Sequence, residues 1–396
     1  MFWKKKKFIP YGRHNINRED VRRVIEVLKS DFLTQGPKVK EFEQNICKEV
    51  DAKHGVATNS ATSALHIACL SLGLSPGDIL WTSPITFVAS ANSALYCGAK
   101  VDFVDIDIST GLMSIKALEE KLKSAKKEGF LPKIVMPVHL AGTSCDMEAI
   151  YKLSKIYDFK IIEDASHAIG GKYKEYFVGS CKFSDVTVFS FHPVKIITSG
   201  EGGIAVTNNK VIFSKMRLFA NHGITKNKDE FINNNFEDWI YEQQLLGYNF
   251  RMSDIQCALG LSQLKRLRKI VNLRNEKLKY YKKYLSPLPV SLLDIPKNTK
   301  SSVHLAIIKL NDFNATEHSK VFHSLRQKHI GVQLHYHPVH LQPFYQNLGF
   351  SEGYLPVAEK YGRTAMTIPL FPEISKSKQY KIVRELEAVL KEVKNN

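Results

Sequence analysis

The sequence of 396 residues lacks the features that define several protein classes. Its six cysteines are widely spaced, with no CxxC pair and no Cys/His cluster at metal-ligand spacing, so we expect buried or inert thiols and assign no metal. No stretch of about 18 uncharged apolar residues occurs, and the basic start "MFWKKKKFIP" is not followed by the apolar segment of a secretory signal. We therefore expect a cytoplasmic protein that does not contact a membrane.

The charge is strongly one-sided, with 56 basic against 39 acidic residues and a net charge of +17. A nucleic-acid-binding protein would gather its basic residues into one stripe or arm with interleaved aromatics. Here the lysines are spread along the predicted helices, and the one dense run, Lys4 to Lys7, is short and terminal. The alternative is a solvated basic surface, which also attracts small polyanionic substrates. We therefore expect no nucleic-acid partner.

The pattern of apolar residues predicts an α/β fold. An amphipathic helix follows the cap residue Asn17, with Val21, Val24, Ile25 and Leu28 on one face, and a second helix follows Pro37. Short apolar strands then alternate with helical stretches, at 79–83, 100–106, 133–142, 159–165, 186–191 and 203–208. Strands that are apolar on both faces indicate a mostly parallel sheet covered by helices on both sides.

Beyond about residue 285 the pattern changes to a smaller α+β unit, with strands predicted at 305–310, 331–336 and 366–370 and helices at 318–330 and 375–393. We predict two domains, a large α/β domain over 1–250 that includes the N-terminal helices, and a linking helix with the smaller α+β domain over 251–396. The Asn-rich stretch around 224–246 is predicted to be a long loop, and loops of that length are usually functional or disordered.

Ligands of open α/β sheets bind beyond the carboxyl ends of the strands, so the residues there come first. In "TNSATSALHIA" (58–68), small and hydroxyl residues lead directly into a helix, whose free N–H groups suit a phosphate held by Ser60, Ala61 and Thr62. The alternative is an ordinary helix cap. Phe87 in "TSPITFVASAN" follows another strand, where its ring can stack on a flat cofactor or simply belong to the core.

Two further stretches carry titratable groups. In "IIEDASHAIG" (161–170), Asp164 ends an apolar strand and needs a positive partner such as a protonated ring nitrogen, with His167 close behind; both also fit a strand-end cap and a buried histidine. In "FSFHPVKIITSGEGG" (189–203), Lys195 lies between a strand and a glycine cluster, and a lysine of lowered pKa can form a Schiff base with an aldehyde. A phosphate cradle, a ring, a carboxylate and an amine together match pyridoxal phosphate.

These stretches, together with "GYNFRMSDIQCALGLSQL", resemble in order and spacing the sugar-nucleotide aminotransferases of the DegT/DnrJ/EryC1/StrS type, from about residue 33 to 345. The resemblance implies a fold type I pyridoxal-phosphate enzyme with a seven-stranded sheet in the large domain. It implies that Lys195 binds the cofactor covalently and then moves protons, and that Asp164 keeps the ring nitrogen protonated. It further implies that Ala61, Thr62 and Ser190 bind the phosphate, that Phe87 covers one ring face, and that His167 lies near the ring hydroxyl.

The resemblance also implies a homodimer, because Asn249 in "GYNFRM" matches an asparagine donated to the phosphate of a neighbouring subunit. Tyr11, Arg251, His335 and His337 are predicted to bind the nucleotide sugar, and each also fits a purely structural role. The forms "NSATSAL", "DASHA" and "FSFHPVK" are similar to the branch that aminates UDP-4-keto-6-deoxy-N-acetyl-L-altrosamine with glutamate on the route to pseudaminic acid, a surface glycan sugar. Many members have Gly and Gln where this chain has Ala61 and His167.

The sequence leaves two alternatives to this proposed function open. One is another 4-keto or 3-keto nucleotide sugar with UDP, GDP or dTDP, and the other is a non-catalytic, regulatory relative. The presence of both Lys195 and Asp164 argues against a regulatory role, and Lys195 argues against the 3-dehydratases of the family, in which histidine replaces the lysine.

Overall fold

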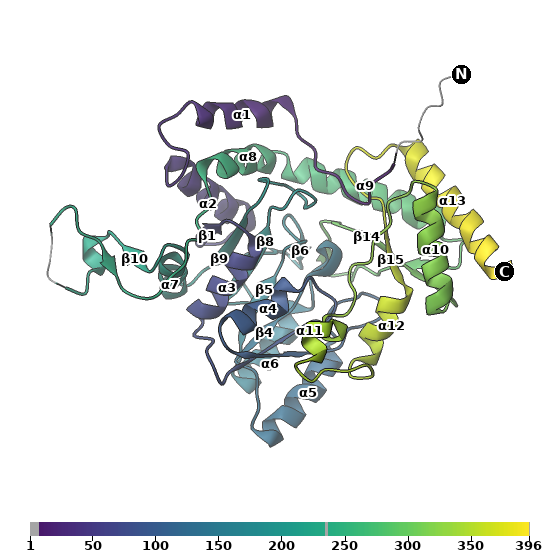
Figure 1. Ribbon diagram of the computed structural model, residues 1–396, viewed down its shortest axis with the longest axis horizontal. Coiled ribbons are helices and arrows are strands. Elements are labelled where there is room, and N and C mark those ends of the chain that lie inside the picture. The colour runs from purple at the N-terminus through teal and green to yellow at the C-terminus, as the bar shows by residue number, and fades with distance from the viewer. Residues whose placement is uncertain (1–7, 234–236, 396) are drawn as a thin grey trace.

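A seven-stranded sheet forms the middle of the larger part of the chain in the computed structural model (Figure 1), which describes residues 8–233 and 237–395. Its strands are β1 (His54–Thr58), β2 (Ile79–Thr82), β3 (Lys100–Phe103), β4 (Ile134–Met136), β5 (Lys160–Asp164), β8 (Val186–Ser190) and β9 (Gly203–Thr207). They lie in the order β1-β9-β8-β5-β4-β2-β3, and β9 runs antiparallel to both of its neighbours while the other pairs are parallel. The predicted mostly parallel α/β sheet is therefore confirmed.

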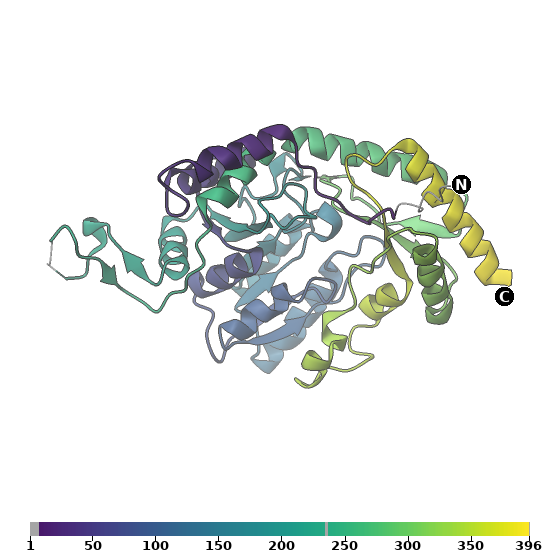
Figure 2. The ribbon, with the colours of Figure 1, turned by 45° about the horizontal axis from the view of Figure 1, so that its top comes forward.

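Both faces of this sheet are apolar because successive side chains of a strand point to opposite sides. Val186 and Val188 of β8 enter one core, whereas Phe189 enters another, and Ala205 and Ile204 of β9 divide in the same way. Helices cover these faces (Figures 1 and 2). They are α2 (Pro37–Val50), α3 (Ala61–Ser71), α4 (Ala89–Tyr96), α5 (Ile115–Glu128), α6 (Met147–Tyr157), α7 (Lys210–Ala220), α8 (Asp254–Leu264) and α9 (Leu267–Leu285).

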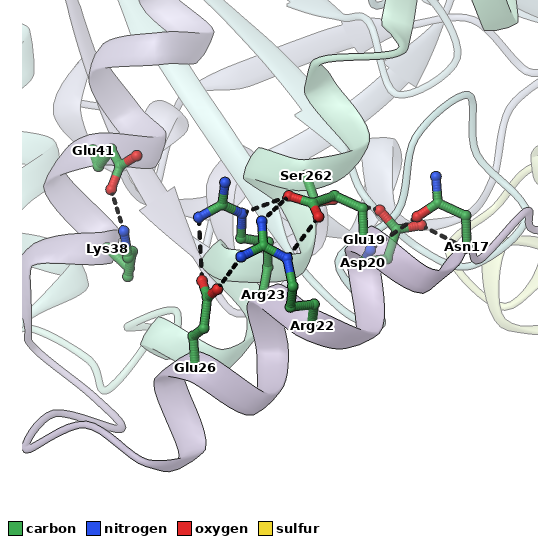
Figure 3. Close-up of polar contacts among 9 residues, drawn as sticks. All are labelled: Asn17, Glu19, Asp20, Arg22, Arg23, Glu26, Lys38, Glu41 and Ser262. Carbon is green, nitrogen blue, oxygen red and sulfur yellow. Dashed lines mark hydrogen bonds and ion pairs between the residues drawn. The ribbon is translucent and has the colours of Figure 1, made fainter.

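Helix α1 (Arg18–Leu28) begins where the sequence predicts, but its packing differs from the usual amphipathic helix. Asn17 and Asp20 form a reciprocal capping box, and the buried Asp20 also accepts a hydrogen bond of 2.6 Å from Ser262 of α8 (Figure 3). The helix therefore faces α8 with Asp20 and Val27. Its predicted apolar face is instead exposed to solvent at Val21, Ile25 and Leu28.

The C-terminal part of the chain forms the predicted smaller α+β unit. Strands β12 (Val290–Leu292), β14 (Ala306–Leu310) and β15 (Ala365–Ile368) pair antiparallel, with α10 (Ala315–Gln327), α12 (Pro356–Thr364) and α13 (Lys376–Asn395) beside them. Its core includes Ile9, whose backbone pairs with the 329–331 segment. The predicted strand over 331–336 forms only a single bridge between Gln333 and Thr367. The division of the chain at 250/251 stays a prediction.

The stretch predicted as a long loop is anchored by a short hairpin of β10 (Ile224–Thr225) and β11 (Glu242–Gln243), which projects from the body (Figure 1). A second small sheet, made of β6 (Lys172–Tyr173), β7 (Tyr176–Phe177) and β13 (Thr299–Lys300), links the two parts of the chain. Within the described ranges, no helix combines the length and the apolar content needed to cross a membrane. The basic run Lys4 to Lys7 lies outside the described residues.

Candidate active site

A cavity of about 410 Å³ lies beyond the carboxyl ends of β5 and β8, where the sequence predicts the ligand site. It is lined by nine of the predicted site residues: Tyr11, Ala61, Thr62, Phe87, Asp164, His167, Ser190, Lys195 and His335. These residues come from the N-terminal segment, from the large sheet and from the C-terminal unit. The fold thus brings together groups that are up to 324 positions apart, from Tyr11 to His335.

The first wall of the cavity is the N-terminus of α3, which follows β1 directly. Ser60 is the N-cap, and its hydroxyl accepts a hydrogen bond from the Ser63 amide. The first N–H groups of a helix have no partner within it, so those of Ala61 and Thr62 are available to an anion. Gly203 of β9 packs against this turn so closely that a Cβ there would lie 2.5 Å from the Ala61 nitrogen. Together these residues form a narrow cradle lined by backbone atoms.

Asp164 is held in place at the end of β5 by hydroxyl donors. The Ser90 hydroxyl of α4 donates to Asp164 Oδ2 at 2.6 Å, and the Ser166 hydroxyl donates to Oδ1, also at 2.6 Å. The neighbouring Glu163 points away from the cavity and pairs with His139 at 2.7 Å. Only one of the two adjacent acids therefore reaches the cavity, because alternate residues of a strand face opposite sides.

Lys195 lies in a turn after β8, where its amide donates to the His192 carbonyl at 2.9 Å. Burial lowers the pKa of its amine from 10.5 to about 8, although the negative charge of Asp164 acts in the opposite direction. A lysine with this pKa is uncharged far more often at neutral pH than a surface lysine. Lys195 can therefore act both as a nucleophile and as a proton carrier.

Aromatic and imidazole rings form the remaining walls. Phe87 stands at the mouth of the cavity, 60% exposed, with Tyr336 6.4 Å away between ring centroids. The ring of Tyr11 packs on that of His335, with their centroids 5.1 Å apart. Nδ1 of His335 forms a hydrogen bond with the Thr367 hydroxyl. Burial, assisted by the charge of Lys195, lowers the pKa of His335 to about 3, so this ring is neutral at physiological pH.

Several residues of the site were not predicted from the sequence. His304 and Tyr336 line it, and Ser90 and Ser166 hold Asp164. The serines had a detectable signal, since they lie in the same short motifs as Phe87 and Asp164. No such signal marks His304, because it lies in an irregular segment before β14 and reaches the cavity only through the packing of the C-terminal unit.

Three predicted residues do not line this cavity. Asn249 is exposed, and its backbone forms a bridge with Asn221. Arg251 donates to the Asn221 side chain at 2.8 Å and borders a separate cavity of about 520 Å³ between α2 and α7. His337 is exposed on the segment beyond Tyr336. That second cavity is larger, but it holds neither Lys195 nor Asp164, so it is not the site of the predicted chemistry.

The residues of the smaller cavity fit pyridoxal phosphate. The cradle at α3 matches a phosphate, and Asp164 supplies an oxygen acceptor for a ring N–H. Nδ1 of His167 is buried without a hydrogen-bond partner among the described residues, so it has a free position for a polar ligand atom. Lys195 supplies the amine.

Comparison with known proteins agrees with this geometry. The model of the DegT/DnrJ/EryC1/StrS aminotransferase family matches residues 14–387. The chain belongs to this family. Among its relatives, the UDP-4-amino-4,6-dideoxy-N-acetyl-beta-L-altrosamine transaminase of Campylobacter jejuni subsp. jejuni serotype O:23/36 (strain 81-176) is 39% identical over 389 residues, which cover 98% of each chain.

Solved structures of other aminotransferases also superimpose on this chain over nearly its full length. Helicobacter pylori PseC, an aminotransferase involved in the biosynthesis of pseudoaminic acid, superimposes with a TM-score of 0.89 at 32% identity, over 98% of this chain and 100% of that one. The PLP form of the putative sugar aminotransferase Spr1654 from Streptococcus pneumoniae gives 0.88 at 28% identity, over 98% and 99% of the two chains. This aminotransferase is thus a fold type I enzyme that depends on pyridoxal phosphate.

Proposed function

We propose that this aminotransferase transfers the amino group of glutamate to the C4 ketone of UDP-4-keto-6-deoxy-N-acetyl-L-altrosamine, a step of pseudaminic acid biosynthesis. The observation that carries the proposal is the presence of Lys195 and Asp164 in one cavity at the strand ends. The names of the Campylobacter transaminase and of PseC support the choice of substrate. The net charge of +17 also suits a nucleoside diphosphate, which is a polyanion.

Each residue of the cavity has a proposed task in this reaction. Pyridoxal phosphate, when bound, supplies an aldehyde carbon for covalent attachment and a ring that withdraws electrons from it. Lys195 provides the amine and then carries a proton between carbon atoms, which its lowered pKa favours. Asp164, fixed by Ser90 and Ser166, accepts a hydrogen bond from the ring nitrogen and keeps it protonated. Phe87 covers one face of the ring and limits the access of water.

Further residues are proposed to hold the phosphate and the sugar nucleotide. The α3 N-terminus with Ala61 and Thr62 binds the phosphate, and the Ser190 hydroxyl contributes from β8. Tyr11 and His335 bind the sugar nucleotide from the far side of the cavity, since both line it. Arg251 and His337 are also proposed to bind the sugar nucleotide, although neither lines this cavity within one chain.

We also propose a homodimer with shared active sites. Asn249 is exposed outside its own cavity, which suits a residue that serves the phosphate of the partner subunit. The exposed apolar stripe of α1, formed by Val21, Ile25 and Leu28, supports an association, and the exposed Phe32 lies just beyond the helix. Covering such residues with a second chain stabilises the complex, because apolar surface is removed from water.

The proposed location is the cytoplasm. All six cysteines are free thiols, and five of them are buried. Free and mostly buried thiols suit a reducing compartment.

One assay tests the substrate assignment directly. The enzyme is incubated with glutamate and a panel of 4-keto-6-deoxy and 3-keto nucleotide sugars carrying UDP, GDP or dTDP, and the products are identified by mass spectrometry and NMR. We expect amination at C4 of the L-altrosamine derivative. Preferred turnover of another nucleotide sugar would replace the proposed substrate, and no turnover of any sugar would favour a regulatory role.

The same assay tests the role of Lys195. We expect Lys195→Ala to lose both the visible absorbance of the bound cofactor and at least about 10³-fold in rate, because the covalent partner and the proton carrier are removed together. Lys376→Ala, at an exposed lysine at the start of α13, is the matched control and should behave as the wild type. Wild-type turnover by Lys195→Ala would contradict the mechanism.

A further inference from the structure

His167 lies in a stack of rings at the back of the cavity. Its ring centroid is 4.4 Å from that of His304 and 6.1 Å from that of Tyr336, and its plane is inclined by 21° to the tyrosine ring. All three side chains line the cavity. His167 is only 5% exposed and His304 only 4% exposed, so the position of the His167 ring is set by protein contacts rather than by water.

The two nitrogens of His167 have different surroundings. Nε2 lies 3.2 Å from the Tyr336 hydroxyl, whereas Nδ1 is buried and has no hydrogen-bond partner among the described residues. The imidazole is neutral, because burial, assisted by the charge of Lys195, lowers its pKa well below 6.5. A neutral imidazole carries a single proton, on one nitrogen or the other.

The hydroxyl of Tyr336 decides between these two tautomers. Burial raises the pKa of Tyr336, so its phenol keeps its proton. If Nε2 carried the proton and donated it to the tyrosine oxygen, the tyrosine proton and the Nδ1 lone pair would both lack a partner. If the tyrosine donates to Nε2, only the N–H at Nδ1 lacks one. Because each buried polar group without a partner costs free energy, the second arrangement is favoured.

We propose that Tyr336 is a positioning residue, whose hydroxyl fixes His167 in the tautomer protonated at Nδ1 and so presents an N–H donor to the ring oxygen of the cofactor. His304 keeps the His167 ring in place, since the two rings are in contact with their centroids 4.4 Å apart. This inference rests on the cofactor site proposed above, but it does not depend on which sugar is aminated.

The tautomer can be measured in the cofactor-free enzyme, without any assay of activity. The protein is labelled with ¹⁵N-histidine, and long-range ¹H–¹⁵N correlation spectra distinguish a protonated from an unprotonated ring nitrogen. The His167 signals are assigned among the 14 histidines by their loss in His167→Gln. We expect Nδ1 to carry the proton in the wild type. A proton on Nε2, or a charged ring at neutral pH, would overturn the proposal.

Tyr336→Phe tests the cause of this preference, since it keeps the ring and removes the hydroxyl. We expect the His167 proton to redistribute between Nδ1 and Nε2 in the variant. Tyr281→Phe is the matched control, because Tyr281 is a buried tyrosine of the other core whose hydroxyl donates to the Pro369 carbonyl. If the tautomer is unchanged in Tyr336→Phe, another group fixes it and the proposal is wrong.

The loaded enzyme supplies a second readout. A donor at Nδ1 stabilises the deprotonated ring oxygen, so in Tyr336→Phe the pH at which the visible cofactor band titrates should rise by about one unit. A purely structural role of Tyr336 would leave this midpoint in place. Failure of the substrate assignment would affect neither readout, which separates the two proposals.

Discussion

Lys195 shows how burial changes the chemistry of a single residue. The chain has many lysines that are charged and solvated, whereas the Lys195 amine is enclosed with Asp164, His335 and the His167 ring. Loss of water lowers its pKa more than the Asp164 carboxylate raises it, and the result is a pKa of about 8. The neighbouring imidazoles are neutral and therefore add no positive charge at physiological pH.

This pKa predicts how cofactor uptake depends on pH. The uncharged amine is the minor form below about pH 8 and the major form above it, so the rate at which cofactor-free enzyme takes up pyridoxal phosphate should rise with pH and level off above about pH 8. The growth of the visible absorbance after rapid mixing measures this rate. A rate that keeps rising up to about pH 10, as for a solvated lysine, would contradict the effect of burial.

Asp164→Asn refines the same experiment. Because the negative charge of Asp164 raises the pKa of Lys195, its removal should lower that pKa further and move the plateau to lower pH. A plateau that moves to higher pH in this variant would show that Asp164 and Lys195 do not interact in the way described.

At the scale of the elements, the site depends on two backbone segments that approach each other without side chains between them. Thr58 at the end of β1 pairs with Gly203 at the start of β9, and α3 begins three residues after Thr58. Gly203 has an ordinary backbone conformation, so its role lies in the missing Cβ rather than in a positive φ. The phosphate cradle is therefore a joint property of β1, β9 and α3.

Gly203→Ala should consequently weaken the binding of pyridoxal phosphate. The new Cβ would lie 2.5 Å from the Ala61 nitrogen, so the first turn of α3 has to move. We expect the dissociation constant of the cofactor, measured by equilibrium dialysis, to rise by about tenfold or more, since a tenfold change corresponds to about 1.4 kcal/mol.

Gly77→Ala is the control for a glycine substitution as such, because Gly77 has open space around its Cβ position and lies outside the cavity. Its positive φ makes the substitution strained, which lowers stability but does not touch the cradle. Equal losses of cofactor affinity in both variants would show that the cradle geometry is not responsible.

A comparison of individual strands and segments shows which parts of the fold and of the site can be predicted from the sequence. The strands β5 and β8 each contain apolar residues and end in a polar group, Asp164 and Ser190, so both the sheet and the site at its edge were predictable. β1 was missed because "HGVAT" begins with a polar residue and a glycine and has no clear pattern. His304 and Tyr336 lie in irregular segments, and only the packing of the C-terminal unit on the large sheet brings them to Lys195.

At the scale of the whole molecule, helix α1 carries an exposed apolar face, which the proposed second chain would cover. Periodicity predicted the helix correctly but not the direction of its apolar face, because Asp20 is buried by its bonds to Ser262 and Gln263 and turns that face outward. Val21 is 50% exposed and Leu28 is 54% exposed. The proposed second copy of this chain would cover these residues, and it would also give the exposed Asn249 a role outside its own cavity.

The double substitution Val21→Asp with Leu28→Asp should therefore separate the proposed dimer. Placing two charges in an apolar contact costs several kcal/mol, because each carboxylate would have to lose its water. Light scattering after size-exclusion chromatography should show twice the chain mass for the wild type and the single chain mass for the double variant. Ile156→Asp, at an isolated exposed apolar residue of α6, is the control and should stay dimeric.

Separation of the proposed dimer should also weaken cofactor binding, since each monomer would lose the contact that we propose for the partner's Asn249. A hydrogen bond to a charged phosphate contributes about 1.5 to 3 kcal/mol, so the dissociation constant of pyridoxal phosphate should rise by about tenfold or more. Asn249→Ala in the intact dimer should give a similar loss, because it removes the same contact without separating the chains. If the monomeric variant binds the cofactor as tightly as the wild type, each chain holds a complete site and the shared role of Asn249 is wrong.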